Sequence, residues 1–178
     1  LAIIGVTLLQ ENADVQTFGI DFPLLATDGA YQLSIGPDIV GRSGLAMDQD
    51  GDGNGGEPGE DVFAIEFLVD STGPRVTTHE PTVALSGQLD QVDLCFSETI
   101  DASTLTLDDL VISGPAGAIA PLSIAAVGSD CHRASLPPQT SVGSYSIALG
   151  PEVADPAGNL MDQDQDGLSG EVGEDVYQ

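Results

Sequence analysis

An acidic tract that occurs twice, 114 residues apart, constrains this chain more than any other feature. Residues 47–62 return as residues 161–176, and each copy carries six acidic residues at identical spacing and no basic residue. Like charges packed this closely repel one another, so an ordered tract needs a cation to hold it. A hard divalent cation with oxygen ligands, above all calcium, is the natural candidate.

The spacing within each tract predicts how the ion is held. Asp48, Asp50 and Asp52 stand at positions 1, 3 and 5 of a loop with glycine at position 6, as in the first half of an EF-hand loop. Position 7 offers a backbone carbonyl, and acidic residues stand at positions 10 and 13 while position 12 is glycine. The candidate calcium ligands are therefore Asp48, Asp50, Asp52, Asn54, Glu57, Glu60 and Asp61 in the first tract, and Asp162, Asp164, Asp166, Leu168, Glu171, Glu174 and Asp175 in the second.

A strand-like sequence rather than a helix follows the first loop, so the loop resembles the calcium loops of dockerins and thrombospondin repeats more than a helix-flanked EF-hand. Its six carboxylates exceed the charge that one calcium ion needs, so each tract has charge enough for two. One alternative is a solvated acidic loop without a specific ion, and another is the carboxylate-rich surface of a halophile's protein. Calcium explains better why the ligand-like spacing occurs twice.

The charge balance excludes several classes of partner. Lys and Arg number 3 against 29 Asp and Glu, a formal net charge of −26, so we expect no binding to nucleic acid or to an anionic membrane surface. No apolar run approaches the roughly 20 residues that cross a bilayer, so we expect no membrane insertion. With 41% hydrophobic residues, the chain also differs from a disordered acidic tail.

The repeat extends beyond the acidic tracts and predicts two related modules. At the same offset, Tyr31 falls on Tyr145 and Gly36 on Gly150. The stretch 73–114 would align before the first residue. We therefore expect a complete module at 73–178 and a partial one, without its opening strands, at 1–72. Local rearrangement, an upstream segment or another copy of the chain would supply those strands, and the start at Leu rather than Met favours a piece cut from a longer secreted protein.

Local patterns are β throughout, with apolar and polar residues alternating and no convincing helical stripe. Gly and Pro turn signals separate short segments at a spacing that is typical of a Greek-key β-sandwich. The candidate strands are 3–9, 18–22, 31–35, 62–69, 75–79, 92–96, 105–112, 118–127 and 145–149.

Four motifs in the second module resemble bacterial Ig-like modules that stand in tandem along secreted and cell-surface proteins. They are Asp70-Ser-Thr-Gly-Pro-Arg-Val, Val92-Asp-Leu-Cys-Phe-Ser-Glu-Thr-Ile-Asp, Tyr145-Ser-Ile-Ala-Leu and Val153-Ala-Asp-Pro-Ala-Gly-Asn-Leu. The resemblance implies all-β, Ig-like Greek-key sandwich modules in tandem, with neighbouring Ig-like modules of the same protein as partners. It also implies a structural, adhesive or spacer role. The first module departs from the pattern, because Gly41-Arg42-Ser43-Gly44 stands where the Asp-x-Ala-Gly piece belongs.

Cys95 and Cys131 permit one disulfide and are too few for a zinc site. Each points to the face opposite the apolar residues of its strand, which argues against an inter-sheet disulfide. A bond between neighbouring strands of one sheet is compatible with this placement. We expect the disulfide rather than two free thiols, and with it an extracellular or cell-surface location.

These observations predict a non-enzymatic, calcium-stabilised structural or adhesive segment of an extracellular repeat protein. Neither histidine belongs to a recognisable catalytic motif with Cys or Ser, and His132 falls on an inward-facing position that favours the edge of the core. No zinc-protease, esterase or phosphate-loop motif occurs. One alternative is a calcium-dependent glycan- or protein-binding module. The other is a subunit of a surface filament that assembles by strand complementation between copies of the chain.

Overall fold

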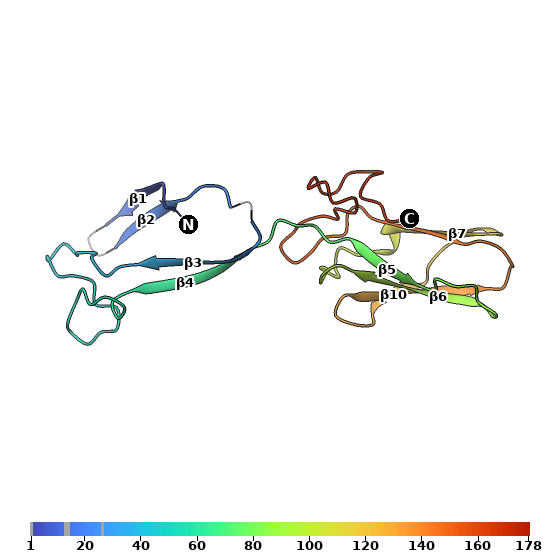
Figure 1. Cartoon of the computed structure of the whole chain (residues 1–178), viewed down its shortest axis with the longest axis horizontal. Coiled ribbons are helices and arrows are strands. Elements are labelled where there is room, and N and C mark those ends of the chain that lie inside the picture. Colours follow the sequence, from blue (N-terminus) through green and yellow to red (C-terminus); the bar gives the residue numbers. More distant parts are fainter. Residues whose placement is uncertain (1, 13–14, 26) are drawn as a thin grey trace. The chain divides into compact units, whose positions relative to one another are not determined.

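The computed structural model describes residues 2–12, 15–25 and 27–178, and it divides into unit 1 (Leu1–Asp70) and unit 2 (Ser71–Gln178). The chain is all-β apart from one 3-10 turn, and among the described residues no helix is long and apolar enough to span a membrane. The elements (Figure 1) are β1 (Gly5–Glu11), β2 (Gln16–Asp21), β3 (Gly29–Ile35), β4 (Phe63–Val69), β5 (Val76–Glu80), β6 (Leu89–Phe96), η1 (Leu107–Asp109), β7 (Leu110–Gly114), β8 (Gly117–Ile119), β9 (Ser123–Ala126), β10 (Cys131–Gln139) and β11 (Ser146–Leu149).

Unit 2 is a β-sandwich-type fold that encloses the hydrophobic core. One antiparallel sheet has the order β5-β6-β10-β9, and the other has the order β11-β7-β8. Val92, Leu94 and Phe96 alternate along β6 and are at most 6% exposed, as the apolar alternation predicted. They form one core cluster with Leu110 and Ile112 of β7.

Two predicted strands are shorter than expected. The predicted strand 105–112 begins only at Leu110, because Thr106 and Asp109 form a capping box around η1 instead. The predicted strand 118–127 is two strands, β8 and β9, with Pro121 between them. Proline has no amide hydrogen to donate to a strand ladder, so it interrupts the pairing there.

The disulfide prediction is confirmed within one sheet. Cys95 and Cys131 stand opposite each other on β6 and β10, with their Cα atoms 4.1 Å apart. Arg133 and Asp93 pair two residues further along the same two strands. The Arg133 guanidinium donates to both carboxylate oxygens of Asp93, at 2.7 and 2.8 Å. A covalent bond and a bidentate ion pair thus fasten β6 to β10.

Local hydrogen bonds repeat between the two units. The hydroxyl of Tyr31 donates to the carbonyl of Thr27 at 2.8 Å, and the hydroxyl of Tyr145 donates to the carbonyl of Ser141 at the same distance. Both bonds join residues four apart, at positions that match under the offset of 114. The sequence repeat is therefore also a structural repeat.

Unit 1 consists of two two-stranded sheets, β1-β2 and β3-β4, and leaves apolar side chains exposed. Phe18 is 53% exposed and Ile39 is 51% exposed, whereas the matching His132 and Val153 of unit 2 are 6% and 0% exposed. In unit 2 these positions pack with the side chains of the opening strands. Strands β1 to β3 match the later part of unit 2, from β8 to β11, and no described strand of unit 1 matches the opening strands β5 to β7.

Candidate metal centres

Each acidic loop follows a strand that ends at a Gly-Pro pair. Gly36 and Gly150 have φ angles of 112° and 115°, which residues other than glycine rarely adopt. A Cβ atom at Gly36 would also clash with the carbonyl oxygen of Asp61, and one at Gly150 with that of Asp175. Glycine at these positions therefore lets the end of each acidic loop pass close to the end of the strand that precedes the loop.

Asp61 and Asp175 anchor the loops from inside, since both side chains are fully buried. The Asp61 carboxylate accepts the backbone amides of Gln49 at 2.5 Å and of Glu57 at 2.8 Å. Asp175 accepts the two matching amides at 2.7 and 2.8 Å. These backbone amides, that of Glu57 foremost, lower the pKa of Asp61. Asp61 therefore stays ionised and fixes the loop that carries the other carboxylates.

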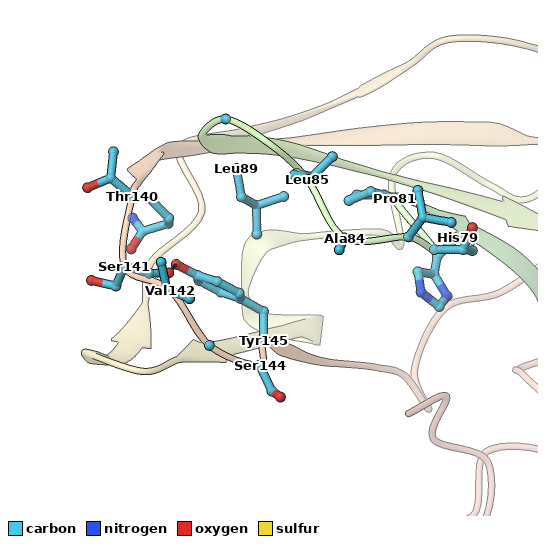
Figure 2. Close-up of a pocket in the computed structure, with 15 residues that line it drawn as sticks. His79, Pro81, Ala84, Leu85, Leu89, Thr140, Ser141, Val142, Ser144 and Tyr145 are labelled. Carbon is cyan, nitrogen blue, oxygen red and sulfur yellow. Dashed lines mark hydrogen bonds between the residues drawn. The ribbon is translucent and has the colours of Figure 1, made fainter.

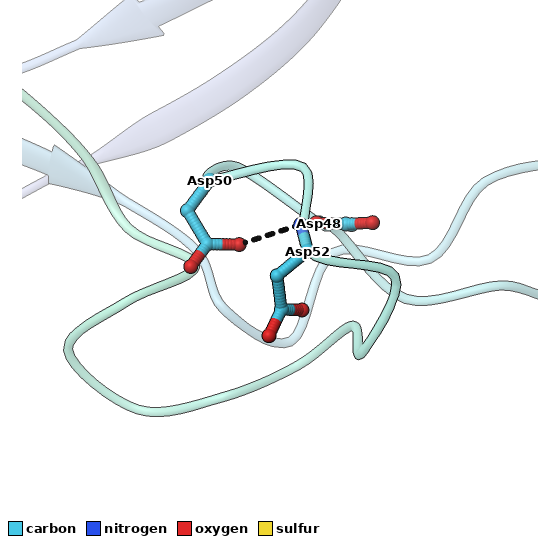
Figure 3. A group of neighbouring side chains, drawn as sticks. All are labelled: Asp48, Asp50 and Asp52. Carbon is cyan, nitrogen blue, oxygen red and sulfur yellow. Dashed lines mark hydrogen bonds between the residues drawn. The ribbon is translucent and has the colours of Figure 1, made fainter.

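The first three aspartates converge as the spacing predicted. One carboxylate oxygen each of Asp48, Asp50 and Asp52 lies within 4.8 Å of the others, on exposed side chains (Figure 3). Asp48 accepts the amides of Gly51 and Gly53 at 2.8 and 3.1 Å, and Asp50 accepts that of Asp52 at 3.1 Å. These bonds turn the chain so that alternate side chains face one point.

The second loop places a carboxylate in the interior. Oxygens of Asp162, Asp164 and Asp175 lie within 4.8 Å of one another, and Asp162 is only 8% exposed. One Asp162 oxygen accepts the amide of Gly167 at 3.1 Å. The other is buried and has no hydrogen-bond partner in the described part of the chain. A buried carboxylate oxygen without a partner is costly, and a bound cation would satisfy it.

Glu57 and Glu171, at position 10 of the two loops, also carry buried oxygens without a hydrogen-bond partner among the described residues. Burial is the largest cause that raises the pKa of each glutamate, and neighbouring carboxylates raise it further. For Glu57 those neighbours include Asp48, Asp50 and Asp52. The loop therefore supplies a side chain from position 10 toward the cluster, where an EF-hand would use position 12.

The remaining predicted ligands stand at positions 7 and 13 of each loop. The amide of Asn54 donates to Asp52 at 2.7 Å, and the amide of Leu168 donates to Asp166 at the same distance. The side chains of Glu60 and Glu174 are exposed, and neither belongs to a carboxylate cluster that the structure brings together. Asp166 is likewise outside these clusters, and both Asp166 and Glu174 contribute to the raised pKa of Glu171.

Gln163 makes a tertiary contact that its position in the tract does not predict. Its side chain reaches from the second loop to the backbone of Val76, the first residue of β5. The available signal was that glutamine follows the first aspartate in both tracts, at Gln49 and Gln163. That signal did not predict the contact, which depends on the tertiary fold.

No family model matches the sequence, and no curated protein is detectably similar to it. Among solved structures, the N-terminal part of the bacterial S-layer protein SbsC is similar to 49% of this chain at 16% sequence identity, with a TM-score of 0.40. The similarity spans 21% of that chain, and it is too low to transfer a role.

Proposed function

We propose that this chain is a calcium-stabilised structural segment of an extracellular repeat protein and not an enzyme. Three buried carboxylate oxygens without hydrogen-bond partners carry the proposal, one each on Asp162, Glu57 and Glu171. All three belong to the repeated acidic loops, where neighbouring carboxylates add to the negative charge. A divalent cation supplies the compensation that the described residues lack.

The donor set fits calcium chemically, because every side-chain donor is an oxygen and most are carboxylates. When bound, calcium supplies positive charge that offsets the repulsion among these groups. The residues that would hold it are Asp48, Asp50, Asp52 and Glu57 in the first loop, and Asp162, Asp164, Asp166, Glu171 and Asp175 in the second.

The second loop forms hydrogen bonds with both sheets of unit 2, so an ion bound in this loop would be connected to the sandwich through them. At its far end, Tyr177 exchanges two backbone hydrogen bonds with Leu149 of β11, at 3.0 and 2.9 Å. Near its beginning, Gln163 bonds Val76 of β5. Ordering the loop therefore stabilises one strand of each sheet, which suits a load-bearing module.

Other features support the extracellular, non-catalytic part of the proposal. The disulfide between Cys95 and Cys131 is typical of oxidising compartments. The His132 ring packs edge-on against Phe96, with ring centroids 5.9 Å apart, so it fills the core. We propose neighbouring Ig-like modules of the same protein as the partners of this segment.

Calcium titration of the full chain, after removal of metal by a chelator, tests the proposal. Calorimetry gives stoichiometry, and thermal melts at fixed ionic strength give stabilisation. A site at hundredfold calcium excess over its Kd adds about 2.7 kcal/mol to the free energy of unfolding. The combined substitution Asp162→Asn and Glu171→Gln should abolish binding to the second loop. The matched control is Asp108→Asn, which removes an exposed carboxylate outside both loops.

Two results would contradict the proposal. One is a melt that excess chelator leaves unchanged. The other is equal stabilisation by monovalent salt without added calcium, which would favour the acidic surface of a halophile's protein.

A further inference from the structure

The first acidic loop contains an asparagine that is followed by glycine, and the second loop does not. Asn54 and Gly55 are both exposed. The matching residues of the second loop are Leu168 and Ser169, and Leu168 is 61% exposed in unit 2, where the opening strands are present. Exposure at this part of the loop is therefore a property of the loop itself and does not depend on what covers the rest of the unit.

An asparagine side chain can react with the backbone nitrogen of the residue that follows it. This nitrogen loses its proton to water and attacks Cγ of the asparagine. The bond between Cγ and Nδ2 breaks, the departing nitrogen takes up a proton and leaves as ammonia, and a succinimide ring remains. Water then opens the ring at either carbonyl carbon and gives aspartate or isoaspartate. A side chain on the following residue hinders the attack, whereas glycine has none and its backbone turns freely.

The structure leaves the attacking nitrogen free and keeps it unhindered. The amide of Gly55 donates no hydrogen bond to any described residue, although the amides of Asn54 and Gly56 on either side both donate, at 2.7 and 2.8 Å. A Cβ atom at Gly55 would lie 2.8 Å from the carbonyl oxygen of Ala46, so the packing of this loop requires glycine there. The least hindered residue type therefore stays next to Asn54.

One hydrogen bond restrains the side chain of Asn54, whose Nδ2 donates to Asp52 at 3.0 Å. Asp52 lies on the exposed part of the loop (Figure 3), where water replaces such a bond readily. The net strength of an ordinary hydrogen bond limits the slowing of the attack to about tenfold.

Two other amide side chains, those of Asn159 and Gln139, are less open to this reaction. Asn159 donates at 2.8 Å to Asp155, which is 1% exposed, and leucine follows it in the sequence. Gln139 lines the cavity of unit 2 that Figure 2 shows, and it donates to the carbonyl of Pro137 at 2.6 Å. A glutamine would also have to close a six-membered ring, which forms more slowly.

We propose that Asn54 is a site of spontaneous deamidation, and that the reaction opens the first acidic loop while the second stays unchanged. Aspartate at this position loses the hydrogen bond to Asp52 and repels its carboxylate. Isoaspartate also inserts one more carbon atom into the main chain between residues 54 and 55, which displaces the loop on either side. One loop of the two thus carries a slow and irreversible change of charge. The reaction does not depend on calcium.

The test incubates the full chain without added calcium at pH 8.5 and at pH 6. Mass spectrometry of proteolytic fragments should show the replacement of an NH2 group by OH at Asn54, and electron-transfer fragmentation should identify isoaspartate there. Because glycine does not hinder the attack, the change at Asn54 should be at least about tenfold faster than at Asn159. It should also be faster at the higher pH, because the attacking nitrogen must lose its proton.

Hydrogen exchange of the aged chain measures the structural consequence. Residues 47–62 should exchange faster than in the fresh chain, and residues 161–176 should exchange as before. The matched control is Asn54→Gln, which keeps the amide group but closes the ring slowly. After the same incubation it should show neither the change in mass nor the faster exchange.

Three outcomes would overturn the proposal. One is an unmodified Asn54 in the chain under conditions that deamidate a synthetic peptide of residues 50–58. Another is an equal rate at Asn54 and Asn159. The third is a deamidated chain in which residues 47–62 exchange as in the fresh chain.

Discussion

Gln163 holds the backbone of Val76 at both of its polar groups. Its side-chain amide donates to the Val76 carbonyl at 3.1 Å, and its side-chain oxygen accepts the Val76 amide at 2.9 Å. The two residues are 87 positions apart in the chain. A side chain of the second acidic loop thus substitutes for a strand partner at the start of β5.

We predict that Gln163→Ala lowers the free energy of unfolding of unit 2 by about 1–3 kcal/mol, because two hydrogen bonds of about 0.5–1.5 kcal/mol each are lost. Calorimetric melts with saturating calcium provide the measurement. Gln49→Ala is the matched control, since Gln49 is exposed at the equivalent position of the first loop. It should change stability by less than about 0.5 kcal/mol. Equal effects of the two substitutions would contradict a special role for Gln163.

Gln165 carries local strain that the first loop avoids. Its φ angle is 66°, and the equivalent residue of the first loop is Gly51 with a φ angle of 77°. A residue other than glycine is destabilised by about 1–2 kcal/mol in this left-handed backbone region. Glycine avoids that cost, but it raises the conformational entropy of the unfolded chain, which offsets part of the gain. We predict that Gln165→Gly raises the free energy of unfolding by up to about 1 kcal/mol, and that Gly51→Gln lowers it by a similar amount. Thermal melts of both variants measure these changes, and a lower free energy of unfolding in Gln165→Gly would contradict the prediction.

The parts of the fold that depend on local alternation could be predicted from the sequence. The buried face of β6 follows from every second residue being apolar, and the outward placement of Cys95 led to the disulfide within one sheet. The convergence of Asp48, Asp50 and Asp52 also follows from their spacing, because a tight loop turns alternate side chains to one point.

The parts that depend on tertiary contacts could not be predicted. Asp61 has the same residue type as Asp48, Asp50 and Asp52, yet its burial makes it a backbone anchor. The contact between Gln163 and β5 exists only in the folded sandwich, because the two residues are 87 positions apart in the chain. The start of β7 at Leu110 was missed because a capping box competes with extended structure, and a periodicity argument does not weigh that competition.

His132 should make the stability of unit 2 depend on pH. Burial lowers the pKa of its imidazole, whereas in the unfolded chain the pKa is about 6.5. As pH falls through about 6.5, the unfolded chain takes up the proton first, so the free energy of unfolding decreases. We predict that His132→Phe, which installs the residue found at the matching Phe18, removes this part of the pH dependence.

The measurement is the change in melting temperature between pH 7.5 and pH 5.5 for each protein, in chelator. The other titrating groups are shared, so the difference between the two changes isolates His132, and overpacking by the larger ring cancels. Identical changes in the two proteins would show that His132 does not couple stability to pH.

Unit 1 should be the less stable half of the chain. All residues of the hydrophobic core cluster belong to unit 2, from Val76 to Met161. Few buried apolar contacts imply a low free energy of local opening. We predict that the backbone amides of β1 and β2 exchange with solvent much faster than those of β6 and β10. Mass spectrometry of peptic fragments after timed exchange measures this difference directly.

Placing a second copy of residues 71–114 in front of the first residue should reduce that difference. The offset of 114 gives this addition the same spacing to unit 1 that the original stretch has within unit 2. Its β6 and β7 side chains would then cover Phe18 and Ile39, which are about half exposed. We predict slower exchange in β2 and a higher melting temperature for unit 1. The control copy carries aspartate in place of Val92, Leu94 and Phe96 and should give neither effect, because charged side chains cannot form the core. If both copies leave exchange in β2 unchanged, the exposed face of unit 1 is not the counterpart of the covered face of unit 2.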